Sequence, residues 1–294
     1  MTTAPDRLLL RLEWRVIRRL DGRLQGAYRT AHRGSGLDFT GLRPYVDGDD
    51  ARHIDWNVTA RLAEVQIRQF IEDRELTAWL VLDASASMSV GTPGRGKHDV
   101  LAELALILTR MLGRGGNRVG AVFYDTGTVR VIPPGTGRHQ ALRIGRELER
   151  TAPSGPAGTT DLSEMLGAVA SLAKRLSLIL VISDFIGTGD WQRPLLRLAH
   201  RNEVVALRVV DTADESLPEA GLIVVQDAET GEQLVIDSSD PWFRERFRHG
   251  IAEREDELTA GMRRAGVPHH RIDTDADLVD ALLGVLAQTR RRRA

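Results

Sequence analysis

The stretch "LVLDASASMS", residues 80–89, places one carboxylate and several hydroxyls directly after an apolar run. Side chains two residues apart in an extended segment point the same way, so Asp83, Ser85 and Ser87 could converge on one point. Asp and Ser at the junction between a strand and a helix are also common N-caps. Taken alone, the pattern therefore leaves metal binding and helix capping open.

Two more positions with oxygen-bearing side chains follow later in the chain. The Gly-rich loop "SGPAGTTDL" contains Thr159 and Thr160 just before a helical pattern, and Asp184 ends the apolar run "LILVISD". Open α/β sheets bind ligands at the carboxyl ends of their strands, where these residues are expected to lie. Two carboxylates with three hydroxyls suit the oxygen coordination of a hard divalent cation. The residues predict a site for Mg²⁺ or Mn²⁺, with one of the two threonines as a ligand.

Several familiar kinds of catalytic site are missing from the sequence. The chain has no cysteine, which excludes disulfides, zinc thiolate sites, iron–sulfur clusters and Cys nucleophiles. No G-x-G-x-x-G follows a strand, and the P-loop and the G-x-S-x-G nucleophile elbow are absent. An aspartyl-phosphate enzyme needs a second acid where this chain has Ser85. A binding protein is therefore favoured over an enzyme. The alternative is a metal-dependent phosphoesterase with Asp83 as nucleophile or ligand.

The segments that must position these residues predict an α/β domain. Short apolar runs rich in Val, Ile and Leu are typical of strands buried on both faces of a parallel sheet, as in "TAWLVLD", "VGAVFYD", "SLILVISD" and "EVVALRVVD". Amphipathic helical patterns separate most of them, which predicts a doubly wound, mostly parallel sheet flanked by helices. The short "DTGT" turn within "VGAVFYDTGTVRVIPP" requires a hairpin, so one strand at an edge of the sheet should be antiparallel.

Changes of pattern along the chain suggest two domains. Residues 1–76 are expected to form an N-terminal accessory module, with a basic amphipathic helix over 6–32 and a strand in "EVQIRQFIE". Residues 77–294 should hold the α/β domain, including a second hairpin near 221–237, a helix over about 242–265 and a last strand in "HHRIDT". All the candidate ligands fall in this second domain.

Composition narrows the cellular setting. A formal net charge of -1 produces no overall field that favours nucleic acid or anionic membranes. No segment reaches the ~20 apolar residues that a membrane span needs. Arg11, Glu13 and Arg15 interrupt the apolar core that a signal peptide would have. We therefore expect a cytoplasmic protein with no nucleic-acid partner and no membrane span.

The candidate ligands resemble the metal-ion-dependent adhesion site of the von Willebrand factor A domain. Its motif is matched by Asp83, Ser85 and Ser87 in "DASAS", Thr160 in "GTTD" and Asp184 in "ISDF". The motif places its threonine two residues after a glycine, here Gly158, which selects Thr160 over Thr159. The resemblance implies that the ion leaves one coordination position to water or to a carboxylate of a partner protein.

A closer resemblance covers most of the chain. The segment "GLRPYVDGDDARHIDWNVTARLAEVQIRQFIEDRE" directly before "LVLDASASM", together with "DAETGE" near the C-terminus, is similar to the bacterial family called domain of unknown function fifty-eight. The resemblance implies a von Willebrand A-like core with additional N-terminal structure. It also implies a MoxR-type AAA+ ATPase as partner in maturing or remodelling other proteins, because genes of the two kinds tend to be neighbours. Many members carry two N-terminal membrane helices that this sequence lacks, so a soluble form is expected.

Overall fold

The computed structural model describes residues 33–62, 64–71, 76–114, 116–151 and 158–293. The chain divides into two units, one within Arg18–Glu75 and one that contains Leu76–Ala294. The helix expected over 6–32 lies outside the described residues. All the apolar runs expected to form the α/β sheet belong to the second unit.

The smaller unit contains a two-stranded antiparallel sheet with two short helices between its strands. Its elements are β1 (Arg33–Pro44), η2 (Ala51–His53), α3 (Trp56–Leu62) and β2 (Gln66–Ile71). The "GSG" at 34–36, whose composition is typical of a turn, falls inside β1. The pairing is irregular there, because Arg33 and Asp38 both lie opposite Ile71. The glycine-containing stretch therefore interrupts the ladder without ending the strand.

The larger unit is built on a six-stranded sheet in the order β10-β7-β6-β3-β4-β5. Its strands are β3 (Thr77–Asp83), β4 (Arg118–Asp125), β5 (Thr128–Gly135), β6 (Ser177–Ser183), β7 (Glu203–Val210) and β10 (His269–Asp273). Neighbouring strands are parallel except β4 and β5, so the antiparallel strand lies at one edge. β3, β6 and β7 are buried along nearly their whole length, as strands covered on both faces are. This sheet confirms the predicted fold class.

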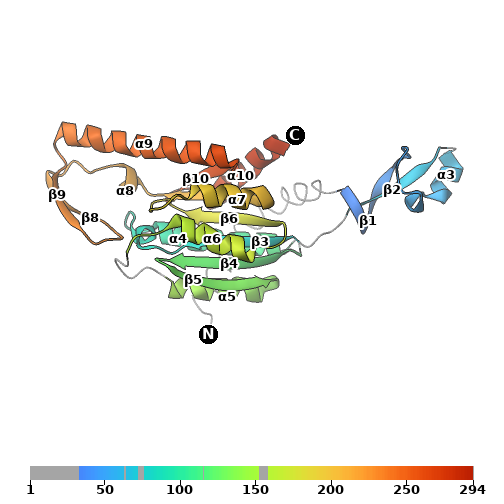
Figure 1. The fold of residues 1–294 in the computed structure, drawn as a ribbon, viewed down its shortest axis with the longest axis horizontal. Helices are drawn as coiled ribbons and strands as arrows, with labels where there is room; N and C mark the ends of the chain where they lie inside the picture. The colour runs from blue at the N-terminus through green and yellow to red at the C-terminus, as the bar shows by residue number, and fades with distance from the viewer. Residues whose placement is uncertain (1–32, 63, 72–75, 115, 152–157, 294) are drawn as a thin grey trace. The chain divides into compact units, whose positions relative to one another are not determined.

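Helices cover both faces of the sheet (Figure 1). They are α4 (Lys97–Arg114), α5 (Gly137–Arg150), α6 (Leu162–Leu172), α7 (Gln192–Arg201), α9 (Pro241–Ala265) and α10 (Leu278–Arg293), with short helices η3 (Ala86–Ser89) and α8 (Thr212–Glu215) after strand ends. Trp79 and Val81 of β3 pack in one core cluster with side chains of α6, α7 and α9. Leu80 and Leu82 alternate with them and are fully buried on the opposite face, where α4 contacts the sheet.

A hairpin lies between α8 and α9. It consists of β8 (Leu222–Gln226) and β9 (Gln233–Asp237), which pair with each other and with no other strand in the described part of the chain. Figure 1 shows the hairpin at the same end of the sheet as α8, which follows the carboxyl end of β7. None of the described helices combines the length and the hydropathy of a membrane span.

Candidate metal centre

β3 and β6 bring the two predicted aspartate ligands to the same edge of the sheet. The strands are parallel neighbours, β3 ends at Asp83, and Asp184 directly follows the end of β6. The Ser183 hydroxyl donates a 2.5 Å hydrogen bond to Asp83 Oδ2, which joins the two strand ends. Asp83 is 0% exposed and Asp184 is 2% exposed, so two acids share one buried region.

The loop after β3 turns Ser85 and Ser87 toward each other. The Ser85 N–H donates to Asp83 Oδ1 at 3.1 Å, and the hydroxyl oxygens of the two serines lie 3.0 Å apart. Ser85 occupies the N-cap position of η3, yet its side chain makes no capping hydrogen bond. Capping therefore does not explain these hydroxyls, and both remain available as neutral oxygen ligands.

Thr160 lies in the loop before α6. Its backbone carbonyl accepts a 2.8 Å hydrogen bond from the N–H of Thr188, in the loop that begins at Asp184. Gly187 permits this contact, because a Cβ there would lie 2.6 Å from the Thr160 carbonyl oxygen. The Thr160 side chain is fully buried, and its Oγ1 has no hydrogen-bond partner among the described residues. Leaving a buried hydroxyl unpaired is costly, so this oxygen is a good candidate ligand.

The residues on either side of Thr160 behave differently from it. Thr159, the other candidate ligand, is exposed, whereas Thr160 is buried. Asp161 accepts hydrogen bonds from the N–H groups of Ser163 and Glu164, at 2.8 and 3.3 Å. It is therefore the N-cap of α6. Of the three consecutive polar residues, Thr160 alone combines burial with an unpaired oxygen.

A lysine that sequence reasoning missed completes this group of residues. Lys97, the first residue of α4, is 1% exposed, and its Nζ donates to Asp184 Oδ2 at 2.9 Å and to Asp214 Oδ1 at 3.1 Å. Burial alone would lower the pKa of Lys97, but attraction to the two carboxylates outweighs burial and raises it. The one feature of the sequence that could have drawn attention to Lys97 is the rarity of lysine, since only Lys97 and Lys174 are lysines among the 40 Lys and Arg residues.

Negative charge is in excess at this edge of the sheet. Lys97 contacts Asp184 and Asp214, and Asp83 is close enough to Asp184 to be repelled by it. When all four groups are ionised, three negative charges face one positive charge, which leaves two negative charges unbalanced. The nearby Arg208 is already paired with Glu255 of α9. Burial, followed by repulsion from Asp184, raises the pKa of Asp83 to about 7. A divalent cation would balance the excess and favour the ionised aspartates.

The kinds of donor present fit a hard cation. Within the described residues, no group of three or more His, Cys, Asp or Glu side chains is arranged to hold a metal ion. An ion at this edge would therefore need hydroxyl ligands in addition to carboxylates. Ser85, Ser87 and Thr160 are buried and supply such oxygens beside two carboxylates, which is the donor chemistry that Mg²⁺ and Mn²⁺ accept.

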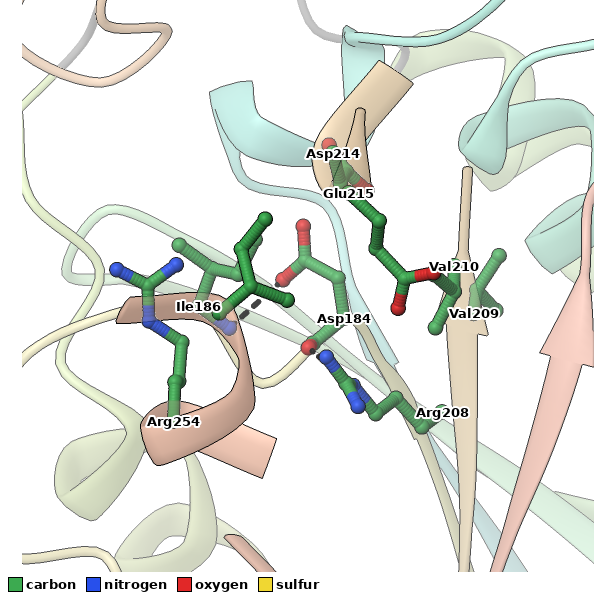
Figure 2. Close-up of a pocket in the computed structure, with 9 residues that line it drawn as sticks. Asp184, Ile186, Arg208, Val209, Val210, Asp214, Glu215 and Arg254 are labelled. Atoms are coloured by element: carbon green, nitrogen blue, oxygen red, sulfur yellow. Dashed lines mark hydrogen bonds between the residues drawn. The ribbon is translucent and has the colours of Figure 1, made fainter. Parts of the chain in front are cut away.

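A small cavity lies beside Asp184, between β7, α8 and α9 (Figure 2). Its charged lining residues are Asp184, Arg208, Asp214, Glu215 and Arg254. The Arg208 Nε donates to the Asp184 carbonyl oxygen at 3.4 Å, which ties β7 to the start of the loop after β6. With a volume of about 20 Å³, the cavity has room for roughly one water molecule and not for an organic substrate.

Comparison with known proteins identifies the family. Residues 41–257 match the family model described as "Protein of unknown function DUF58". The chain belongs to the DUF58 family. Uncharacterised proteins of Mycobacterium tuberculosis and Mycobacterium bovis are each 37% identical to this DUF58 chain over 281 residues, 95% of the chain and 88% of the relative. An uncharacterised Mycobacterium avium protein is 33% identical over 163 residues, 54% of the chain and 94% of the relative.

Solved structures similar to this DUF58 chain include BatB of Bacteroides thetaiotaomicron. It is 14% identical, with a TM-score of 0.45, and the match covers 72% of the chain and 99% of BatB. The VWA domain of SpRpn10 is 12% identical, with a TM-score of 0.40, over 71% of the chain and 94% of that domain. Both scores are low, and the von Willebrand A-like core of the DUF58 chain is assigned from its own sheet order and strand directions. The family and the core fold expected from the sequence are confirmed.

Proposed function

We propose that this DUF58 protein is a metal-dependent protein–protein interaction module. Asp83, Ser85, Ser87, Thr160 and Asp184 would hold one Mg²⁺ or Mn²⁺ ion at the carboxyl ends of β3 and β6. The observation that carries the proposal is the buried Thr160 Oγ1, which has no partner among the described residues. An ion would give this oxygen the partner that the described side chains do not supply.

The residues around the ion determine what it can bind. Three of the five ligands are neutral hydroxyls, and Lys97 already offsets part of the charge of Asp184. When bound, the ion supplies positive charge that can accept a carboxylate of another protein. Without the ion, that carboxylate would meet Asp83 and Asp184 as like charges, so partner binding should require the metal.

A MoxR-type AAA+ ATPase is the partner that we propose, in an assembly that matures or remodels other proteins. The resemblance to the DUF58 family supports this choice, because that resemblance implies neighbouring genes for the two proteins. The acid that contacts the ion would belong to the ATPase or to its client protein. Because the ATPase needs ATP, the proposal places the encounter in the cytoplasm.

Calorimetric titration with MgCl₂ and MnCl₂ tests the metal site directly. The wild-type protein should bind one ion, and Asp83→Ala should bind none. Asp125→Ala is the matched control, because Asp125 ends β4 at the same sheet edge but is not a proposed ligand. Capture of a purified MoxR-type ATPase should then need the metal and should be lost with EDTA. Equal capture by wild type and Asp83→Ala, with and without EDTA, would refute the interaction role.

The phosphoesterase alternative makes a different prediction. Asp83 would have to act as nucleophile or ligand, yet Ser85 stands where the second acid would be needed. Hydrolysis of p-nitrophenyl phosphate with Mn²⁺ that disappears in Asp83→Asn would replace the binding role with an enzymatic one.

A further inference from the structure

The tip of the β8–β9 hairpin carries a buried acid. Glu229, between the two strands, is only 8% exposed. Along the strands themselves, apolar side chains are far more open to solvent, with Leu222 76% and Val235 65% exposed. This order of burial is the reverse of the usual one. Valine and leucine side chains are usually buried, whereas glutamate is rarely buried without a partner. The reversal calls for a reason specific to Glu229.

Glu229 is buried against the loop that carries the candidate ligand Thr160. Its Oε2 accepts a 3.0 Å hydrogen bond from the Thr160 N–H, and its backbone carbonyl accepts one of 3.1 Å from the Gly158 N–H. The hairpin tip therefore contacts the loop at two points, and both lie within two residues of the proposed ligand. The acid comes from residue 229 and meets a loop 69 positions earlier in the chain.

The local geometry of the tip fixes the direction of Glu229. Asp227 Oδ1 accepts hydrogen bonds from the N–H groups of Glu229 and Thr230, at 3.0 and 2.7 Å, and from the Thr230 hydroxyl at 2.9 Å. Gly231 has a positive φ of 75°, which suits the turn back into β9. Hydrogen bonds of this kind between a side chain and the backbone define the turn, and the turn places Glu229 against the Thr160 loop.

One carboxylate oxygen of Glu229 lacks a partner. Oε1 is buried and makes no hydrogen bond among the described residues, and the same is true of Thr160 Oγ1. Two unpaired buried oxygens therefore occur on residues that are joined by a hydrogen bond. A buried carboxylate oxygen is more costly to leave unpaired than a neutral group, so both observations point to a cation or its bound water at this place.

We propose that Glu229 is an acidic member of the metal centre, supplied by the hairpin. This inference rests on the proposed function, because it assumes the ion held by the five ligands. Glu229 increases the affinity for the divalent ion by its charge and through water bound to the ion, and it is the chain's own acid beside the proposed ligand Thr160. Binding of the ion should in turn hold the hairpin tip on the Thr160 loop.

The substitution Glu229→Gln tests the negative charge of Glu229 separately from its hydrogen bond to Thr160. The amide oxygen can still accept from the Thr160 N–H, whereas the negative charge is gone. Glu232→Gln is the matched control, since Glu232 is an exposed acid of the same turn. Mg²⁺ titration of the full chain by calorimetry should show a 10- to 100-fold loss of affinity in Glu229→Gln, the range seen when groups that support a metal site are removed, and less than a twofold change in Glu232→Gln.

Hydrogen–deuterium exchange supplies a second readout. Mg²⁺ should slow exchange in the hairpin of the wild type and of Glu232→Gln, but not in Glu229→Gln. If Glu229→Gln does not fold, Glu229→Asp keeps the charge on a shorter side chain and should show a smaller loss of affinity. Equal Mg²⁺ affinity in wild type and the Glu229 variants would overturn this inference alone. A wild type that binds neither Mg²⁺ nor Mn²⁺ would overturn the proposed function together with it.

Discussion

Replacing Lys97 by Met is the sharpest test of how the charges in this protein are balanced. The Lys97 ammonium contacts Asp184 and Asp214 at 2.9 and 3.1 Å. Methionine has a similar length and fills the same space without charge, so the change removes the ion pairs and leaves most of the packing. Lys174→Met is the control, because Lys174 is the chain's other lysine and is exposed.

The size of the effect follows from burial. Lys97 and Asp184 are 1% and 2% exposed, and Asp214 is 17% exposed, so solvent screens these pairs little. Removing one partner of a buried pair leaves an uncompensated charge, which typically costs about 3–5 kcal/mol. We expect a loss of that order in the free energy of unfolding for Lys97→Met, against less than about 0.5 kcal/mol for Lys174→Met.

Urea unfolding at pH 7 with EDTA is the assay, repeated with Mg²⁺. The ion should stabilise Lys97→Met more than it stabilises the wild type, because loss of the ammonium leaves more negative charge around the site. Lys97 stays charged between pH 6 and 9, so any change of the penalty in this range comes from Asp83, whose pKa of about 7 lets it lose its negative charge near pH 6. The penalty should therefore be smaller at pH 6 than at pH 9. A lysine whose pKa is raised by folding contributes stability that is fully present below its unfolded pKa of about 10.4 and is lost only as the pH rises through the folded value. A penalty below about 1 kcal/mol in EDTA would refute this account of the charge balance.

Two further predictions concern other parts of the larger unit. Asp211 is fully buried and accepts hydrogen bonds from Thr92 and Thr274, and although burial opposes them, these bonds lower its pKa to about 2. The Asp211 carboxylate should contribute about 2 kcal/mol to the free energy of unfolding above pH 4, and this contribution should be lost as the pH falls through about 2. In urea unfolding, the difference in free energy of unfolding between wild type and Asp211→Asn should therefore be clearly smaller at pH 3 than at pH 6. Gly187→Ala should displace the Thr160 loop and weaken Mg²⁺ binding about 10-fold by calorimetry, because the added Cβ would lie 2.6 Å from the Thr160 carbonyl oxygen. Gly167→Ala, on an open part of α6 with no atom within 4 Å of the new Cβ, should leave Mg²⁺ binding unchanged and raise stability by about 0.5–1 kcal/mol.

Features that depend on local sequence were predictable. Continuous apolar runs indicated strands buried on both faces, and the short turn at residues 125–128 required the antiparallel edge strand β5. Asp161 as a helix cap follows from its position directly before α6. Strand ends could also be located, and this placed Asp83 and Asp184 at one sheet edge because parallel strands present their carboxyl ends together.

Features that depend on contacts between distant residues were not predictable in the same way. Lys97 and Asp184 are 87 positions apart, and Glu229 and Thr160 are 69 apart. Neither pair leaves a periodic pattern, because a single side chain that reaches across a fold has no repeat in the sequence. A buried lysine or glutamate also resembles an exposed one until the surrounding elements are placed, so only its rarity or its motif can draw attention to it.

Charge balance connects the two proposals. With Glu229 engaged, the acids Asp83, Asp184, Asp214 and Glu229 face Lys97 and one divalent ion, which leaves one negative charge in excess. Such a site would repel another acid, so we expect a partner's carboxylate to bind only when Glu229 moves away. The exchange disturbs little packing, because the apolar side chains of β8 and β9 are mostly exposed. We therefore expect Glu229 to compete with the partner, whose acid would have to bind at the ion more tightly than the hairpin does.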